Sequence, residues 1–357
     1  MTADTIGGVW TYCVDLIKCL AQDNVHFHLM TSGKRINSSQ WIDLKELSNV
    51  TVYETDHKLE WMSDPWKDID DSGRLLMRLE KLIKPDIIHL NSFSYASLPF
   101  AAPTLVVAHS DVFSWWNAVK TTKPGSDWSE YFSRVQQGLK NADYIVAPSH
   151  AALRDTFNVY GQFAKGKVVY NGRDKMMFSA RGKNQQLMCA GRLWDEAKNL
   201  QIVLKASRDI KAGIKIAGEL PGGIEPNESI TFLGRLDATE MASELSTALI
   251  YVAPAKYEPF GLSILEAAFC GCVLVLGDIP SLREIWQESA IYINTNDAAN
   301  LASTCNKLLN DPILTEKYSH RAQERARLFS LQQMKIGYSR LYQQIVQQKH
   351  PGKMQTA

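Results

Sequence analysis

The chain has 357 residues with a formal net charge of +1, and 45% of them are hydrophobic. This length predicts two or three domains, and the balanced charge excludes the basic surplus that nucleic-acid-binding proteins carry. No apolar run reaches the roughly 20 residues of a membrane-spanning helix, and acidic Asp4 and Asp15 interrupt the region where a secretory signal would be apolar. We therefore expect a cytoplasmic globular protein without a nucleic-acid partner, and we leave peripheral contact with the inner face of the membrane open.

Strand and helix patterns alternate along the chain. Runs rich in Val, Ile and Tyr predict strands over residues 26–32, 51–55, 86–90, 104–109, 144–148, 167–171, 187–191, 215–218, 230–234, 249–254, 273–278 and 291–294. Between them, helix patterns cover residues 9–21, 74–84, 128–140, 151–160, 200–209, 239–247, 261–270, 282–287, 298–310, 312–329 and 332–348. Because this alternation is typical of parallel sheets with helices on both faces, we expect an α/β fold.

The alternation runs twice, on either side of a polar linker at residues 173–186. We therefore predict two doubly wound, Rossmann-like domains, at residues 1–172 and 187–331, with the final helix 332–348 completing the first. Ligands of such sheets bind outside the carboxyl ends of the strands, so two domains facing each other would enclose a cleft. The segment before Gly7 is short, so that either the first strand is a stub or the given sequence begins late, and we expect the polar tail 349–357 to be frayed.

The stretch YEPFGLSILE, residues 257–266, follows the predicted strand 249–254. Gly261 begins a helix pattern, and the first amides of a helix are unpaired and carry partial positive charge, which favours phosphate. Glu258 precedes this helix and Glu266 lies inside it, so each could accept hydroxyl groups on one side of a phosphate. Such a ligand is a nucleotide sugar. Either glutamate could also be a surface acid, but Glu266 has apolar neighbours, among which an unpaired carboxylate would be costly.

Further candidates lie at other strand ends. Arg192 and Lys198 follow strand 187–191, where two cations would stabilise a leaving diphosphate without a metal. Gly7 and Gly8 precede a helix and predict a second anion or close-approach site. His109 ends strand 104–109, with a purely structural role as the alternative.

Five stretches in this order resemble the retaining family-4 glycosyltransferases of the GT-B fold, in particular bacterial enzymes of polysaccharide synthesis. They are residues 7–12, 107–111, 170–174, 190–199 and 258–284. Together the stretches span nearly the whole chain, and the set is specific although each stretch alone is weak. Two departures stand out: Arg173 replaces an apolar residue of the family motif, and the spacing from Arg192 to Lys198 is one residue longer than the commoner form.

The resemblance implies transfer of a hexose from a nucleoside-diphosphate sugar, with UDP-glucose as our choice, to a hydroxyl of a carbohydrate or lipid-linked acceptor. It implies retention of configuration, a role in exopolysaccharide or glycolipid synthesis, and no metal or other cofactor. The implied catalytic residues are His109, Arg192, Lys198 and Glu258. The implied donor-binding residues are Gly7, Gly8, Asn171, Gly234, Arg235, Phe260, Gly261, Leu262 and Glu266. A sugar-nucleotide epimerase of the same fold and a non-catalytic sugar-nucleotide-binding subunit stay open as alternatives.

Trp115 and Trp116 follow His109 closely, and aromatic faces stack on sugars. We suggest that they border the acceptor pocket, with core packing as an equally open alternative. The segment 68–71 matches the D-x-D pattern of metal-dependent glycosyltransferases, but we reject a metal site because Asp71 or Ser72 would cap the helix predicted from residue 74. The six cysteines form no C-x-x-C pair, and we expect free thiols.

Overall fold

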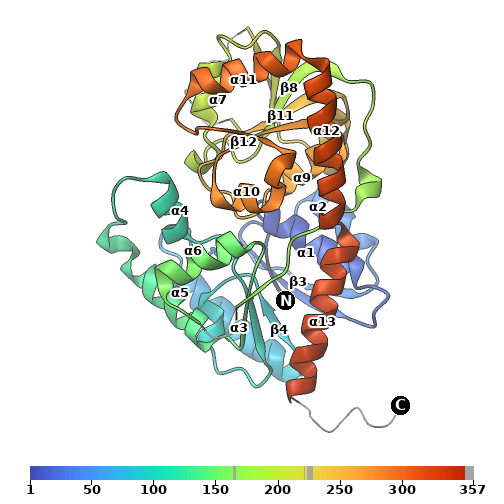
Figure 1. Ribbon diagram of the computed structural model, residues 1–357. Coiled ribbons are helices and arrows are strands. Elements are labelled where there is room, and N and C mark those ends of the chain that lie inside the picture. Colours follow the sequence, from blue (N-terminus) through green and yellow to red (C-terminus); the bar gives the residue numbers. More distant parts are fainter. Residues whose placement is uncertain (164–165, 221, 223–227, 350–357) are drawn as a thin grey trace. The chain divides into compact units, whose positions relative to one another are not determined.

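The computed structural model describes residues 1–163, 166–220, 222 and 228–349, and the predicted tail beyond residue 349 lies outside this range. The chain divides into two compact units. Unit 1 comprises Met1–Asn171 with the segment from Leu331 onward, and unit 2 comprises Gly172–Ser330. In Figure 1, unit 1 runs from blue to green and includes the red C-terminal helix α13.

Unit 1 contains two parallel sheets, which hydrogen bonds between Asn91 and Thr2 connect. The first has the order β1-β2-β3 and the second the order β4-β5-β6-β7. Asn91, directly after β4, donates its backbone N–H to Thr2 Oγ1 at 2.8 Å and its side-chain amide to the Thr2 carbonyl at 2.6 Å. The short first strand that the sequence predicts is therefore present and is tied to β4 by these bonds. The strands are β1 (Thr2–Asp4), β2 (Phe27–Ser32), β3 (Val50–Tyr53), β4 (Ile88–Leu90), β5 (Thr104–Val107), β6 (Tyr144–Ala147) and β7 (Gly166–Val168).

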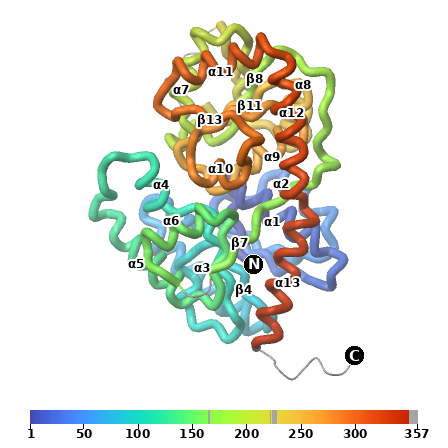
Figure 2. The backbone as a smooth tube through the Cα atoms, viewed as in Figure 1, coloured from blue at the N-terminus to red at the C-terminus, as the bar shows by residue number. Residues whose placement is uncertain are grey.

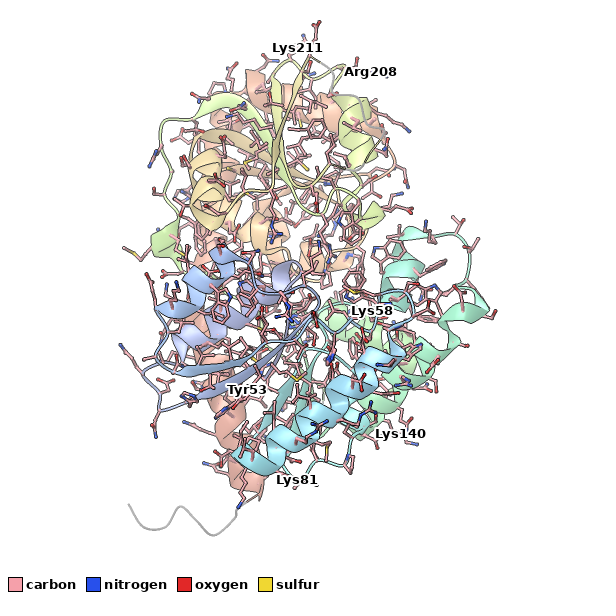
Figure 3. The ribbon with its side chains drawn as sticks, turned by 180° about the vertical axis from the view of Figure 1, so that it is seen from behind. Tyr53, Lys58, Lys81, Lys140, Arg208 and Lys211 are labelled. Atoms are coloured by element: carbon pink, nitrogen blue, oxygen red, sulfur yellow. The ribbon has the colours of Figure 1, made fainter. Side chains whose placement is uncertain are left out.

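Helices cover both faces of these strands. Val107 of β5 packs in the cluster that contains α1, α2 and α13, whereas its neighbour Val106 packs in the cluster that contains α3, α5 and α6. The polar sides of the helices face solvent, as Lys81 of α3 and Lys140 of α5 show (Figure 3). The helices are α1 (Gly8–Cys19), α2 (Ser38–Lys45), α3 (Trp66–Ile83), α4 (Val112–Val119), α5 (Ser129–Asn141), α6 (His150–Tyr160) and α13 (Leu331–Lys349).

Unit 2 contains one six-stranded parallel sheet in the order β10-β9-β8-β11-β12-β13. In the two central strands, Met188 of β8 lies opposite Lys215 of β9 on one side and Tyr251 of β11 on the other. The strands are β8 (Asn184–Ala190), β9 (Gly213–Ala217), β10 (Ile230–Gly234), β11 (Ala248–Ala253), β12 (Val273–Gly277) and β13 (Ile291–Ile293).

Helices cover both faces of this sheet as well. On one face α7 and α11 pack against each other and against the strands, as Figure 2 shows, and α8, α9 and α12 pack on the other face. The central strands are consequently buried on both sides, which explains their continuous apolar sequences. The helices are α7 (Leu200–Ala206), α8 (Ala238–Thr247), α9 (Leu262–Phe269), α10 (Pro280–Trp286), α11 (Ala298–Asn310) and α12 (Pro312–Ala326).

Every predicted strand is present within a few residues of its expected bounds. Two helices were not predicted, α2 and α4. Each begins with a local signal that was overlooked: Asn37 caps α2 in a capping box with Gln40, and Asp111 caps α4 by accepting from the Ser114 amide.

The predicted cap at Asp71 or Ser72 is wrong, because α3 begins at Trp66 and contains the whole segment 68–71. Ile69 and Leu76 are buried and set the helical period, but charged residues between them hide it. Asp71 pairs instead with Lys67, four residues earlier on the same helix, at 2.9 Å.

Candidate functional site

The strand order of unit 2 reverses between β8 and β11. β9 and β10 lie on one side of β8, while β12 and β13 lie on the far side of β11. At such a switch point the loops leaving the two neighbouring strands diverge, which opens a crevice at their carboxyl ends. Arg192 and Lys198 follow β8, whereas Glu258 and Gly261 follow β11. The fold of unit 2 therefore gathers four predicted site residues at the edge where doubly wound sheets bind ligands.

Lys198 and Glu258 meet directly across this crevice. Lys198 Nζ lies 2.5 Å from Glu258 Oε2, and the two side chains are 24% and 15% exposed. Both residues line a pocket together with Cys189, Ser263 and Ile264. The added residue in the spacing between Arg192 and Lys198 therefore does not displace the lysine from the pocket.

Two residues that the sequence analysis missed fix the loop after β8. Asp195 accepts from the Ala197 amide at 3.0 Å and pairs with Arg192 at 2.9 Å. Asn199, in the left-handed conformation with φ 58°, donates its amide to the carbonyls of Pro254 at 3.0 Å and Thr295 at 2.7 Å. These bonds tie the loop to the ends of other strands. An Asn directly after Lys198 is a signal for such a turn, since Asn tolerates this conformation better than most residues.

The first turn of α9 lies where the sequence predicts an anion site. Gly261 caps the helix with φ 89°, and a Cβ there would lie 2.7 Å from Ile264 Cδ1. Glycine is required because side chains rarely adopt this conformation. The helix ladder begins with the Leu265 amide, which donates to the Gly261 carbonyl at 3.1 Å, so the amides of Leu262 and Ser263 precede it. They form the positive end of the helix dipole beside the Lys198–Glu258 pair.

The side chain of Phe260 is buried in the core and is not available to contact a ligand. Its ring is 3% exposed and packs edge to face on Phe329, with centroids 5.7 Å apart. The ring anchors the loop between β11 and α9, so that any donor contact of Phe260 would come from its backbone.

Glu266 lies on α9 and is buried, as expected from its apolar neighbours. Its carboxylate is paired: Arg173 Nε lies 2.8 Å from Glu266 Oε1. The Arg173 guanidinium therefore compensates for the burial of this carboxylate, so burial alone does not imply a ligand at Glu266. Arg173, which departs from the family motif, therefore has a role that was not predicted.

Cys189, which lines the pocket, and Tyr251 of the neighbouring strand β11 are both uncharged near pH 7. Burial raises the pKa of Cys189 to about 12, although the nearby Lys198 charge lowers it. Burial likewise raises the pKa of Tyr251 well above its usual value, and its hydroxyl donates to the Ala190 carbonyl at 3.3 Å. The charged side chains at this edge of the sheet include the pairs Lys198–Glu258 and Arg192–Asp195.

Gly234 and Arg235 stand at the carboxyl end of β10, two strands from β8. The Gly234 carbonyl accepts from the Gly218 amide at 2.8 Å, and Arg235 is exposed. Both residues therefore lie at the same edge of the sheet as Lys198.

In unit 1, His109 follows β5 and is held by Asn91. His109 Nε2 lies 2.8 Å from Asn91 Oδ1, while Asn91 Nδ2 donates to the Thr2 carbonyl. Because the amide nitrogen faces Thr2, the amide oxygen accepts from His109, which assigns the hydrogen to Nε2 and leaves Nδ1 as an acceptor. Desolvation lowers the pKa of His109 to about 3, so the ring is neutral near pH 7.

The glycine loop of unit 1 connects to the same region. Gly7 caps α1, which starts at Gly8, and has a positive φ of 88°. One turn later, the Tyr12 ring meets the His109 ring edge to face, with centroids 4.6 Å apart. Asn171, the last residue of this part of unit 1, is buried, and its Oδ1 has no hydrogen-bond partner among the described residues.

Trp115 and Trp116 lie on α4 in an aromatic cluster. Their ring centroids are 6.1 Å apart, and Trp116 also contacts Trp128 and donates its Nε1–H to the Thr122 carbonyl at 2.7 Å. Both rings are half-buried. Packing thus explains part of their surface, and an acceptor role stays a prediction.

The described residues contain no group of three or more His, Cys, Asp or Glu side chains that could hold a metal ion. Within the same residues, no helix combines the length and apolar character needed to cross a membrane. The six cysteines are free thiols, as predicted.

Two family models match most of the chain. The model described as Glycosyltransferase Family 4 matches residues 6–175, and the model described as Glycosyl transferases group 1 matches residues 184–311. The curated glycogen synthase of Mycobacterium tuberculosis is 26% identical over an alignment of length 287, which covers 70% of this chain and 67% of that protein.

Solved structures share the fold over nearly the whole chain. Sucrose-phosphate synthase from Thermosynechococcus elongatus has a TM-score of 0.82 at 17% identity, covering 96% of this chain and 94% of that one. Anabaena HepE, solved in complex with UDP-glucose, has a TM-score of 0.77 at 16% identity, covering 96% of this chain and 100% of that one. With the switch-point site of unit 2 and both family matches, these similarities lead to one conclusion: the chain belongs to the family-4 glycosyltransferases and is an enzyme of the GT-B fold.

Proposed function

We propose that this glycosyltransferase takes a hexose from a UDP-sugar, with UDP-glucose as the preferred donor, and transfers it to a hydroxyl of a carbohydrate or lipid-linked acceptor. The choice of donor is supported by Anabaena HepE, whose structures contain UDP or UDP-glucose. Retention of the anomeric configuration follows from the resemblance of the motifs to retaining family-4 enzymes. The product would belong to a polysaccharide or glycolipid.

The observation that carries the proposal is the meeting of Lys198, Glu258 and the first turn of α9 beside one pocket. On this proposal the diphosphate rests on the amides of Leu262 and Ser263. As the bond to the sugar breaks, negative charge grows on the diphosphate, and the cations Arg192 and Lys198 stabilise it most in the transition state. These groups supply positive charge without a metal, and the proposal includes none.

The two glutamates would hold the two ends of the donor. Glu258, which pairs with Lys198 beside the pocket, would accept hydrogen bonds from hydroxyls of the hexose. Glu266 would accept hydrogen bonds from hydroxyls of the ribose. The backbone at Gly234 and Arg235 would contact the base. A carboxylate accepts several hydrogen bonds at once, so the ion pair of Glu258 is compatible with sugar binding.

Unit 1 would supply neutral groups. His109, with Nδ1 as an acceptor, would contact a hydroxyl of the donor sugar, and the backbone at Gly7, Gly8 and Asn171 would approach the donor closely. Trp115 and Trp116 would border the acceptor. The acceptor hydroxyl then passes its proton to the departing diphosphate on the same face of the sugar, so that no carboxylate nucleophile takes part.

The test begins with thermal stabilisation by UDP-glucose, UDP-N-acetylglucosamine and GDP-mannose. A donor at 100 times its dissociation constant adds about 2.7 kcal/mol to the free energy of unfolding. We expect the largest shift with UDP-glucose, followed by UDP release and an α-linked product when sugar or glycolipid acceptors are added. Stabilisation by GDP-mannose alone would overturn the donor assignment. Conversion of UDP-N-acetylglucosamine without an acceptor would indicate an epimerase, and binding without transfer to any acceptor a non-catalytic subunit.

A further inference from the structure

Arg173 and Glu266 form a buried ion pair inside unit 2. Arg173 Nε lies 2.8 Å from Glu266 Oε1, and the two side chains are 6% and 12% exposed. Arg173 is the second residue of the unit, whereas Glu266 lies on α9. The pair is therefore made by the fold and not by neighbouring positions in the sequence.

Burial gives this pair its chemical importance. A buried carboxylate without a partner tends to take up a proton, because water no longer solvates its charged form. A guanidinium within hydrogen-bonding distance favours the charged form instead, and removing one member of such a pair leaves the other charge uncompensated. The contact with Arg173 thus favours the ionised form of the Glu266 carboxylate, which burial disfavours.

Arg173 is itself held in a defined position. Its backbone N–H donates to the Phe329 carbonyl at 3.2 Å, and it forms an isolated β-bridge with Ser330. Its guanidinium lies 5.4 Å from the centroid of the Phe178 ring. These contacts place the planar, positively charged guanidinium of Arg173 at a defined position beside the Glu266 carboxylate.

We propose that Arg173 is a positioning residue for Glu266, which it holds in the charged form and in one orientation as an acceptor for the ribose hydroxyls of the nucleotide. The inference rests on the proposed function, because that function gives Glu266 its ligand. It goes further by assigning control of ribose recognition to a side chain that acts only through another. A carboxylate has more acceptor sites than one arginine nitrogen uses, so both contacts are compatible.

The test compares UDP with 2′,3′-dideoxy-UDP, which lacks the ribose hydroxyls. Dissociation constants are measured by calorimetry for the wild type, Arg173→Met and Arg173→Lys. The wild type should bind UDP roughly tenfold to 100-fold more tightly than the dideoxy compound, as expected for hydrogen bonds to a charged group. Arg173→Met should lose this preference while its affinity for the dideoxy compound stays unchanged, and Arg173→Lys should keep part of it.

A pH series separates positioning from a merely structural role. In Arg173→Met the pKa of Glu266 should rise, because the Arg173 charge no longer offsets the effect of burial. Its preference for UDP should return as the pH is raised from 6.5 to 8.5, whereas the wild-type preference stays constant. Both ligands carry the same phosphates, so phosphate titration cancels in the ratio. Arg327→Met is the matched control, since it breaks an exposed pair with Glu324 at 3.0 Å and should change neither ratio nor pH dependence.

The outcomes are distinguishable. A folded Arg173→Met variant with the wild-type preference for UDP overturns the inference and leaves the proposed function intact. A wild type that binds both ligands equally overturns the ribose assignment of Glu266 and with it the inference. If Arg173→Met does not fold, Arg173→Lys decides, because full wild-type preference in that variant contradicts the need for the guanidinium fork, and partial loss supports it.

Discussion

The polar sites of the two units are held in opposite ways. In unit 2, Lys198 and Glu258 are both charged and lie 2.5 Å apart at the carboxyl ends of β8 and β11. In unit 1, the residue at the carboxyl end of β5 is the neutral His109, hydrogen-bonded to the neutral amide of Asn91 at 2.8 Å. Both sites occupy the edge of a parallel sheet that ligands use, so the fold alone does not decide which chemistry stands there.

The difference agrees with the different tasks that we propose for the two units. Charged groups suit a leaving diphosphate, whose charge changes during the reaction, and the helix dipole of α9 adds to them. A neutral imidazole suits hydroxyl groups, whose charge does not change. Desolvation lowers the pKa of His109 to about 3, so its ring is neutral near pH 7.

The largest effect should come from removing a cation of unit 2. Lys198→Ala or Arg192→Ala should lower kcat by about 100-fold to 1,000-fold, with a much smaller change in donor affinity, since the lost charge acts mainly in the transition state. Steady-state kinetics with UDP-glucose, together with calorimetric donor binding, measures both quantities.

The matched control for these variants is Lys215→Ala. Lys215 lies on β9 of the same sheet and pairs with Glu244 of α8 at 2.7 Å. Its side chain is about as exposed as that of Lys198. Its loss should change kcat by less than about twofold, because pairs of this exposure contribute little. Equal effects of Lys198→Ala and Lys215→Ala would mean that the cation after β8 has no special role.

A second effect concerns unit 1 and acid. An unfolded histidine binds a proton below its usual pKa of about 6.5, but His109 in the folded unit does so only near its lowered pKa of about 3. His89, on β4, is shifted downward mainly by desolvation too. The unfolded state therefore binds more protons in this window, and the free energy of unfolding of unit 1 should fall as the pH falls below 6.5.

We expect a loss of about 2 kcal/mol between pH 6.5 and pH 5 for one such histidine. Hydrogen exchange at the amides of β4 and β5, corrected for the intrinsic pH dependence, measures it separately from unit 2. His109→Gln should make the dependence shallower. An identical slope in wild type and variant would contradict the burial of a neutral ring.

A third and smaller effect tests the helix terminus in unit 2. Gly261→Ala places a side chain on a residue with φ 89° and within 2.7 Å of Ile264, so the free energy of unfolding should fall by about 1–2 kcal/mol. UDP should bind more weakly because the first turn of α9 shifts. Gly213→Ala is the control, since nothing lies within 4 Å of its added Cβ, and chemical denaturation of both variants should differ accordingly. Equal stabilities would refute the need for glycine at the cap.

Much of the fold could be predicted because its strands are continuous apolar runs. Helices cover both faces of β11 and β12, so the sequences of these strands are continuous hydrophobic runs, which are easy to recognise. The start of α3 was missed because Asp68, Asp70 and Asp71 suggest a boundary, whereas tertiary packing of Ile69 and Leu76 extends the helix through them. In this segment, tertiary packing overrides the low helix propensity of the aspartates.

The candidate site divides in the same way. Glu258 and Gly261 could be predicted because they share one short stretch with the helix that they precede. Arg173 and Asn91 could not, because their partners Glu266 and Thr2 are far away in the sequence. Contacts made between distant segments carry no local pattern, so the residues that orient the site are harder to find than those that form it.

The smallest expected effect tests the aspartates of unit 1 against the cations of unit 2. Asp70 pairs with Arg134 at 2.7 Å on the surface, and Asp68 accepts from the Lys58 amide at 2.9 Å. If these aspartates make only surface contacts and bind no metal, the double variant Asp68→Asn with Asp70→Asn should change the free energy of unfolding by less than about 1 kcal/mol. Donor turnover should stay at the wild-type level.

The same variant decides whether a metal enters the reaction through this segment. We expect turnover in EDTA to match turnover in magnesium, for the wild type and for the double variant, because Arg192, Lys198 and the first turn of α9 already supply positive charge to the diphosphate. A metal held by Asp68 and Asp70 would behave differently: the wild type would lose turnover in chelator and regain it with manganese, and the double variant would not regain it. That result would mean that a metal bound by unit 1 supplies positive charge to the diphosphate. It would contradict our assignment of this task to the cations of unit 2.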